Sequence, residues 1–299
     1  QQMPFTTKEV YDYVFNSKFQ DLYREQSYGK VSFSGDVKGW YTVPRNEVRD
    51  TTCGDRWRDE LQRSEIADLI AAKGINLAGY DRLEVFQYYN LCDFSSHSDI
   101  GSGAFNVAGQ IYNISIAVIA AHAPLTDPQY YADYYWRALA HEMGHSLGLV
   151  HANGLDCGVE VNSGNCYSVE YGNIFDGMGQ GLGKHFNAVY KNILGWIDPT
   201  AVLTITSSGR YTINPLELVS GTRLAKVLLP DGFTPYYFEY RRAYGYDSGL
   251  NLANQRGLTA EAIWPGNQYY HTTQLIDFAP TADPFAGDVQ NKAVLSVGQ

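Results

Sequence analysis

The chain has 299 residues, a hydrophobic fraction of 44% and a formal net charge of −10. Its length allows two domains or one large one, and its apolar content is sufficient for a sizeable core. Because only 22 Lys and Arg residues face 32 Asp and Glu residues, a nucleic-acid or anionic-membrane partner is disfavoured. The sequence contains no run of about 18 apolar residues, so we expect no membrane-spanning segment.

Hydrophobic periodicity and turn residues predict a mixture of helices and strands in the first half of the chain. The expected elements are, in chain order, a helix over 6–25, a strand and hairpin over 30–43, an amphipathic helix over 55–73, a buried strand over 82–90, a glycine-rich loop reading GSGAFNVAG, a strand over 111–121 and a helix over 128–148. Asp127 and Pro128 are a suitable cap and first turn for the last helix. This order indicates an α+β fold.

The pattern changes after this helix. Residues 152–182 are rich in glycine and loops, and residues 186–195 predict a short closing helix. After Pro199, short alternating runs such as VLTIT and YYFEYR are separated by turn residues, apart from one helical turn near Thr259–Ile263. This alternation predicts a β-sandwich-like C-terminal domain over residues 199–299.

Residues 141–151 read HEMGHSLGLVH and supply three imidazoles and one carboxylate. His141 and His145 are four residues apart, so a helix projects both from one face. Glu142 lies beside the first His, where its carboxylate can reach a metal-bound water without being a ligand. Gly148 allows a left-handed turn that brings His151 back to the same metal. Three neutral imidazoles leave a fourth position for water, as in catalytic rather than structural zinc sites.

This string resembles the signature of the metzincins, zinc endopeptidases whose second hallmark is a Met-turn beneath the zinc. Residues 174–179 read IFDGMG, so the resemblance implies that Met178 forms an apolar floor under the His ligands. The flanking sequences SYGKVSFSGDVKGWYTVP, GKHFNAVYKNILGW and YYFEYRRAYGYDSGL are similar to those of the gametolysin-type metalloproteases of algal cell walls and their bacterial relatives. The N-terminal part also resembles the immune-inhibitor-A type, which lacks the third His at this spacing.

The resemblance implies a metzincin-like catalytic domain over residues 1–198, with a twisted mixed sheet, long helices, a zinc-site helix and a Met-turn subdomain. It implies a secreted zinc-dependent endopeptidase with Glu142 as the general base. We expect a monomer that acts on a protein or peptide substrate. The substrate would lie along an edge strand, with residues 111–119 as the first candidate and GSGAF as the alternative. Gln180 stands where some metzincins place a Tyr, so no Tyr is assigned to the site.

The four Cys residues allow three pairings. Cys157 and Cys166 bracket a short polar loop, and we expect them to pair, which leaves Cys53 and Cys92 for a second bridge. A metal role for Cys is the alternative, but no C-x2-C unit occurs. The stretch TTCGD around Cys53 also resembles the inhibitory cysteine of some metzincin propeptides, although the family likeness already begins upstream of it.

Other titratable residues allow further interpretations. His185 follows the Met-turn and is a candidate for the S1′ side of a substrate cleft, or else a polar residue near a helix start. Three further histidines lack ligand spacing, and we expect them to be structural or exposed: His97, His122 and His271. Carboxylates crowd the loops after the zinc string and make calcium an alternative ligand there, although no EF-hand spacing occurs. They are Asp156, Glu160, Glu170 and Asp176.

Two other functions are compatible with these residues. The first is an inactive protease-fold protein that serves in binding or adhesion. Decayed proteases usually lose the base or a ligand, however, and here Glu142 and the three His residues are intact. The second is a zinc hydrolase that acts on another type of bond. The extended signature together with a Met-turn favours peptide hydrolysis.

Overall fold

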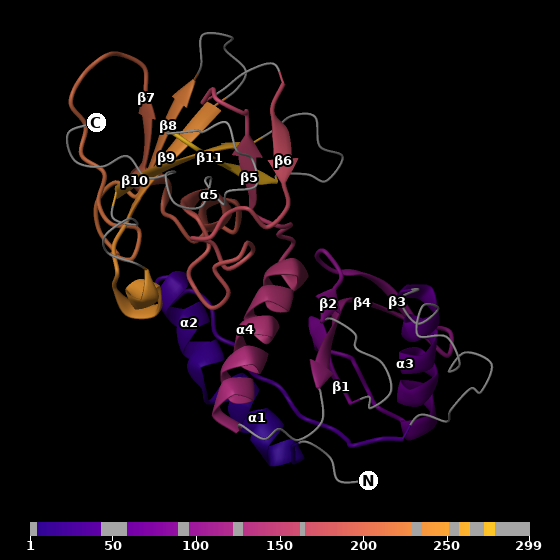
Figure 1. Ribbon diagram of the computed structural model, residues 1–299. Helices are drawn as coiled ribbons and strands as arrows, with labels where there is room; N and C mark the ends of the chain where they lie inside the picture. The colour runs from indigo at the N-terminus through magenta and orange to yellow at the C-terminus, as the bar shows by residue number, and fades with distance from the viewer. Residues whose placement is uncertain are drawn as a thin grey trace. The chain divides into compact units, whose positions relative to one another are not determined.

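The computed structural model describes residues 5–42, 59–88, 96–121, 128–161, 165–228, 235–250, 257–263 and 272–278. The chain divides into two compact units, which we call unit 1 (Gln1–Asn16 with Ser34–Gly148) and unit 2 (Ser17–Phe33 with Leu149–Gln299). Each unit combines helices with a mixed sheet, so the predicted α+β class is confirmed (Figure 1). No helix among the described residues is long and apolar enough to cross a membrane.

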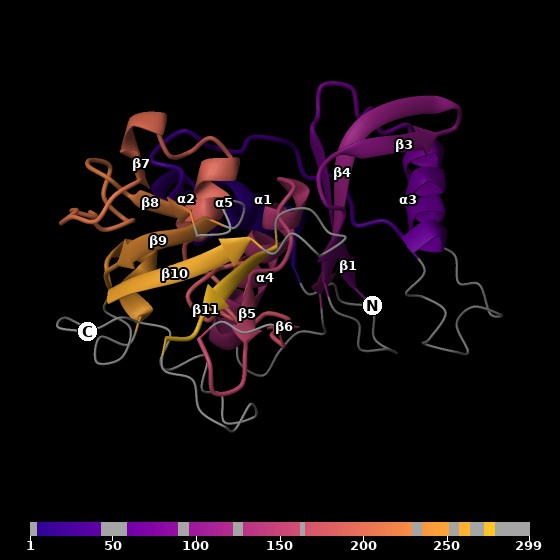
Figure 2. The same cartoon turned by 90° about the horizontal axis from the view of Figure 1, so that it is seen from above.

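Unit 1 contains a four-stranded sheet with helices around it. Its elements are α1 (Thr7–Phe15), α3 (Asp59–Lys73), β1 (Arg82–Tyr88), β2 (His97–Ser98), β3 (Gly103–Val107), β4 (Gln110–Ala121) and α4 (Pro128–Ser146). β1 pairs with β4 in parallel, whereas β2 and β3 pair with β4 in antiparallel fashion. α3 lies against the sheet, and Ile66 and Ile70 of this helix share one hydrophobic cluster with Phe105, Ile114 and Val118 (Figure 2). β4 is therefore the central strand of the unit.

Unit 2 contains a seven-stranded mixed sheet in the order β6-β5-β11-β10-β9-β8-β7. Its elements are α2 (Lys18–Gln26), β5 (Asn153–Asp156), β6 (Tyr167–Val169), α5 (Ala188–Ile193), the 3-10 helix η2 (Pro199–Ala201), β7 (Val202–Ile205), β8 (Leu224–Leu228), β9 (Pro235–Arg241), the 3-10 helix η3 (Gly245–Gly249), β10 (Gly257–Ile263) and β11 (Thr273–Ile276). β5 and β6 form a hairpin that joins the sheet through the parallel pairing of β5 with β11.

The C-terminal part differs from the prediction. The described strands after residue 199 belong to one sheet, not to the two packed sheets of a sandwich. That sheet also contains β5 and β6, so the division of the chain does not follow the predicted boundary after residue 198. The link is the pairing of Asn153 with Gln274, which are too far apart in sequence for a local pattern to reveal. Thr259–Ile263, predicted as a helical turn, is part of strand β10.

The predicted glycine-rich loop GSGAFNVAG also differs, because Gly103–Val107 form strand β3. A two-residue turn joins β3 to β4. Its residues, Ala108 and Gly109, have φ angles of 49° and 91°, and the Asn106 side chain accepts a hydrogen bond from the Gly109 amide (2.8 Å). Positive φ at both central residues matches the twist of a hairpin. The Ala in the first position hid this turn from the sequence pattern.

The N-terminal segment forms two helices, α1 and α2, where one was predicted over 6–25. The second begins because the Ser17 hydroxyl accepts a hydrogen bond from a backbone amide of the next turn. The predicted strand and hairpin over 30–43 are wrong for residues 30–42, which contain no strand. There the amide and carbonyl of Phe33 bond to the Gln20 side chain (2.9 and 2.7 Å) and are not available to a partner strand.

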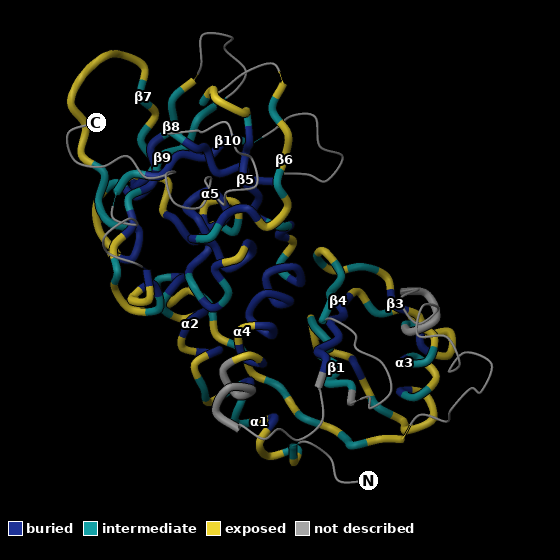
Figure 3. Tube along the Cα trace, viewed as in Figure 1, coloured by how far each residue is buried: buried dark blue, intermediate teal, exposed yellow. Residues whose placement is uncertain are grey.

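A buried arginine connects several elements of unit 2. The side chain of Arg241 is 1% exposed. Its guanidinium donates to three backbone carbonyls between β6 and α5, and it lies within ion-pair distance of two buried carboxylates. The carbonyls are those of Phe175, His185 (3.0 Å) and Phe186 (2.8 Å), and the carboxylates are those of Glu239 (2.8 Å) and Asp247 (3.5 Å). Figure 3 shows that the segment before α5 and the middle of this sheet are buried.

We predict that Arg241→Met lowers the free energy of unfolding by about 3–5 kcal/mol. The substitution keeps most of the side-chain volume but leaves the buried carbonyls and carboxylates without their cation. Denaturant unfolding measures the loss. Arg242→Met is the matched control, because the Arg242 side chain is exposed and forms no ion pair with a described residue. It should change stability by no more than about 0.5 kcal/mol. Equal effects of the two substitutions would contradict the role given to Arg241.

Candidate metal centre

Helix α4 carries His141 and His145 in its last turns and ends at Ser146. Their spacing of four residues puts both rings on one face, with ring centroids 4.9 Å apart. The helix ends because Gly148 adopts a φ of +97° and its amide donates to the His145 carbonyl (2.7 Å). A Cβ at position 148 would meet no atom within 4 Å, so glycine is needed there for its conformation and not for space.

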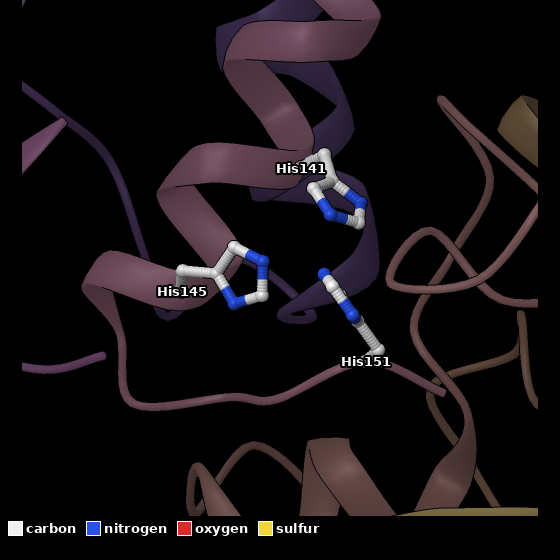
Figure 4. A group of neighbouring side chains, drawn as sticks. All are labelled: His141, His145 and His151. Atoms are coloured by element: carbon white, nitrogen blue, oxygen red, sulfur yellow. The ribbon is translucent and has the colours of Figure 1, made fainter. Parts of the chain in front are cut away.

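The loop after α4 brings His151 to the same two histidines. Each of the three residues offers one ring nitrogen, and these atoms lie within 4.8 Å of one another (Figure 4). A tetrahedral zinc with bonds of about 2.0–2.1 Å holds nitrogen ligands about 3.3 Å apart, so small rotations close the set on a cation. Among the described residues, no other group of three or more His, Cys, Asp and Glu residues could hold a metal ion. Three imidazoles suit zinc and neighbouring transition metals.

Met178 lies in a tight turn that is hydrogen-bonded to the residue after His151. Its side chain is fully buried, and its carbonyl accepts a hydrogen bond from the Ala152 amide (2.9 Å). Its own amide donates to the Asp176 carboxylate (2.6 Å). The turn requires a residue without a side chain next to the Met, because a Cβ on Gly179 would lie 2.0 Å from a backbone carbonyl oxygen. The backbone of this turn therefore helps to place the third His.

Glu142 follows His141 on α4 and is 5% exposed. Its Oε2 atom has no hydrogen-bond partner among the described residues. Burial, reinforced by the nearby Glu84 carboxyl, raises the pKa of Glu142 to about 8. Burial also raises the pKa of Glu84 to about 7, against the opposing charge of Arg82. A divalent cation on the histidines would lower both pKa values.

Glu84 was not singled out from the sequence, although a signal was present. It lies in β1, whose sequence RLEVFQY had been predicted as a buried strand. Both of its carboxylate oxygens are buried and have no partner among the residues that the structure describes. A buried acid costs free energy unless it is protonated or paired. An acidic residue inside an apolar, buried strand is therefore a useful marker of a polar site.

The cysteine prediction is confirmed for one bridge. Cys157 and Cys166 form a disulfide with Cα atoms 4.1 Å apart. The second predicted bridge cannot be compared with the structure and stays a prediction. Four predicted residues lie outside the described ranges: Cys53, Cys92, His122 and His271. His97 lies in β2 and is partly exposed.

One interpretation of the sequence placed His185 in a substrate cleft. The structure places it in the interior instead. Its side chain is 0% exposed, with Nε2 2.9 Å from the Glu25 carboxylate and Nδ1 3.1 Å from the Lys191 ammonium nitrogen. Burial, together with the Lys191 charge, lowers the pKa of His185. Since its amide also donates to the Asp247 carboxylate (3.0 Å), His185 belongs to the buried polar interior of unit 2.

The four carboxylates considered for calcium do not come together as a group. Asp156 accepts a hydrogen bond from a tyrosine hydroxyl (2.6 Å), and Glu170 bonds to the His151 ring (2.8 Å). Asp176 is buried and accepts hydrogen bonds from two backbone amides (2.6 Å each). Glu160 is exposed, and its side chain has no partner among the described residues. Their separate roles give no support to a calcium site.

The first candidate for the substrate edge, residues 111–119, lies in β4, which is not an edge strand because β1 and β2 pair with it on opposite sides at residues 117 and 118. β1 pairs with β4 over residues 115–121, whereas residues 110–114 of β4 pair with β3 alone among the described strands. β3 pairs with β4 and with no other described strand, so β3 is an edge. It contains the last three residues of the alternative segment GSGAF.

Comparisons with known proteins found no relative of this chain. No protein-family model, no curated protein and no solved structure matches the chain. The function is therefore inferred from the residues of the site and their geometry.

We predict that Glu142→Gln changes how the stability of the metal-free protein depends on pH. The pKa of Glu142 is raised from 4.5 to about 8 in the folded chain. A raised carboxyl pKa contributes stability that is fully present below the unfolded value and is lost as pH rises through the folded value. Wild type and variant should therefore melt alike in acid, and the variant should melt higher at alkaline pH, by roughly 2–4 °C for each kcal/mol. A melting-temperature difference that does not change with pH would contradict this assignment.

Proposed function

We propose that the protein is a secreted zinc endopeptidase of the metzincin type. The observation that carries the proposal is the meeting of His141, His145 and His151 within 4.8 Å, with the buried carboxyl of Glu142 next to the first of them on α4. Three imidazoles leave a coordination position for water or substrate. The buried turn at Met178 supports the metzincin type. The Cys157–Cys166 disulfide supports an oxidising location outside the cytosol.

The chain supplies the proton transfer that peptide hydrolysis needs. Zinc at the three histidines would provide a Lewis acid and a water molecule of lowered pKa. Glu142 would accept the proton of that water through Oε2, which has no other described partner, and pass it to the leaving amine. Its buried environment suits both steps, because burial favours the protonated carboxyl that exists between them.

An extended peptide is the form of substrate that unit 1 is suited to bind. β3 is an edge strand, so a peptide can add to it through main-chain hydrogen bonds. The amide of Gly101, two residues before β3, donates to the His145 carbonyl (2.8 Å), which ties the start of this edge to the end of α4. Main-chain pairing is largely independent of side chains, and it supports proteins or peptides as the substrate class.

We predict that Glu142→Gln keeps the fold and the zinc but lowers proteolytic activity by about 10²–10⁴-fold, because an amide cannot accept the proton. Activity on an unfolded protein substrate measures the effect, and Glu160→Gln should remain as active as the wild type. A Glu142→Gln protein with near wild-type activity would rule out this base. A fully zinc-loaded wild type that cleaves no peptide bond would favour the inactive, binding-protein alternative.

We predict one zinc per chain, and its loss in His151→Ala. Two imidazoles on α4 remain in that variant, which is too few ligands to hold the metal tightly. Elemental analysis after dialysis gives the zinc content, and thermal unfolding of the metal-free proteins shows that the variant still folds. Wild-type zinc content in His151→Ala would overturn the third-ligand assignment.

A further inference from the structure

A carboxylate that directly follows strand β6 contacts the third histidine. The Oε1 atom of Glu170 lies 2.8 Å from Nδ1 of His151, across 19 residues of sequence. The side chain of His151 is 23% exposed and that of Glu170 is 68% exposed. Because Nδ1 faces Glu170, the ligand atom that His151 offers to a cation is Nε2. Figure 4 shows the His151 ring with a nitrogen directed at the other two rings.

The residue after Glu170 contacts the same ring. The rings of Tyr171 and His151 have centroids 3.8 Å apart and planes inclined by 36°. Tyr171 adopts a φ of +59°, a left-handed backbone conformation that is unfavourable for a non-glycine residue unless its surroundings hold it there. Two hydrogen bonds do so: its amide donates to the Asn153 side chain (3.1 Å), and its carbonyl accepts from the Gln180 amide (3.2 Å). A strained residue that is fixed in this way against a candidate metal ligand suggests a role at the site.

The hairpin β5–β6 determines how close Glu170 lies to His151. Gly154 of β5 lies opposite Val169 of β6, directly before Glu170. The segment after β6 approaches β5 so closely that a Cβ on Gly172 would lie 2.5 Å from the Gly154 amide nitrogen. The Cys157–Cys166 disulfide closes the other end of the hairpin. The position of Glu170 is therefore determined by backbone pairing and not by the side chain alone.

The backbone of His151 is held independently of its ring. The Tyr190 hydroxyl donates to the His151 carbonyl (2.9 Å), and the next amide, that of Ala152, donates to the Met178 carbonyl (2.9 Å). These bonds fix the main chain but leave ring rotation and the choice of protonated nitrogen open. His151 lies in a loop, unlike the two histidines on α4, so its ring has the greatest need of outside support.

We propose that Glu170 and Tyr171 are positioning residues for His151. Glu170 selects the tautomer with the proton on Nδ1, so that the lone pair on Nε2 faces the metal, and the Tyr171 ring fixes the plane of the imidazole. Such outer partners orient a histidine ligand and raise its basicity. The inference rests on the proposed metal centre. It gives the β5–β6 hairpin a role in orienting the third ligand.

Zinc affinity tests the inference without reference to activity. The metal-free wild type, Glu170→Ala, Glu170→Gln and the control Glu160→Gln are titrated with zinc against a chromophoric chelator. Glu170→Ala should bind zinc about 10–100-fold more weakly, as expected for loss of an outer-shell partner. Glu170→Gln should lie between it and the wild type, because the amide oxygen still accepts the Nδ1 proton but carries no charge. Glu160→Gln should match the wild type.

A second measurement separates positioning from general stability. Nitrogen-15 spectra of the metal-free protein should show His151 protonated on Nδ1 in the wild type and a shift toward protonation on Nε2 in Glu170→Ala. The metal-free melting temperatures of all four proteins should agree, because both glutamates are exposed. Unchanged zinc affinity in Glu170→Ala, or a loss matched by lower metal-free stability, would overturn the inference. A wild type that binds no zinc would refute the metal centre itself, and the nitrogen-15 spectra would still decide whether Glu170 sets the tautomer.

Discussion

The geometry around the third histidine depends on the buried guanidinium of Arg241. It donates to one carbonyl before the Met178 turn and to two carbonyls after it. It also lies within ion-pair distance of Glu239 in β9 and Asp247 in η3. Burial opposes the ionised form of Asp247, yet the Arg241 charge holds the pKa of Asp247 below its usual value. A buried ionic network adds little net stability, but losing one partner is costly. The loop that carries Met178 therefore has one arrangement that satisfies its polar groups.

Solvent is excluded from this network, because Lys191 and Asp176 beside it are fully buried. Burial lowers the pKa of Lys191 to about 7, with the Arg241 charge acting in the same direction. Burial raises the pKa of Asp176 to about 7, although Arg241 and two backbone amides favour its ionised form. Asp176 also bonds to the Met178 and Asn187 amides, so it links the turn to the start of α5. The interior of unit 2 is thus held by polar contacts as much as by apolar packing.

The three candidate metal ligands could be predicted because their arrangement is local. Helical spacing places His141 and His145 together, and the glycine at 148 ends the helix so that His151 can turn back. The residues that act on them could not be predicted in this way. Glu84 lies near Glu142 only because β1 pairs with β4, and Glu170 reaches His151 only because β5 pairs with β6. Contacts across strands leave no fixed spacing in a sequence.

Because sequence patterns report local spacing only, they revealed some parts of the fold and not others. The helices α3 and α4 and the strands β1 and β4 follow clear periodicity and lie close to their predicted ranges. The composition of unit 2 does not follow from periodicity, since α2 joins it through contacts such as that of the Gln26 side chain, which accepts a hydrogen bond from the Phe186 amide (3.0 Å), 160 residues away. The predicted boundary after residue 198 separates β5 from β11, its parallel partner in the same sheet.

That parallel pairing also orders events during synthesis. β5 begins two residues after His151, and its partner β11 emerges from the ribosome about 120 residues later. Closing so long a stretch of chain has an entropic cost, and pairings between distant segments form slowly. The nascent protein thus exposes its histidines for some time before the sheet beside them is complete. The strand that pairs with β5 is complete only after Ile276 has been made.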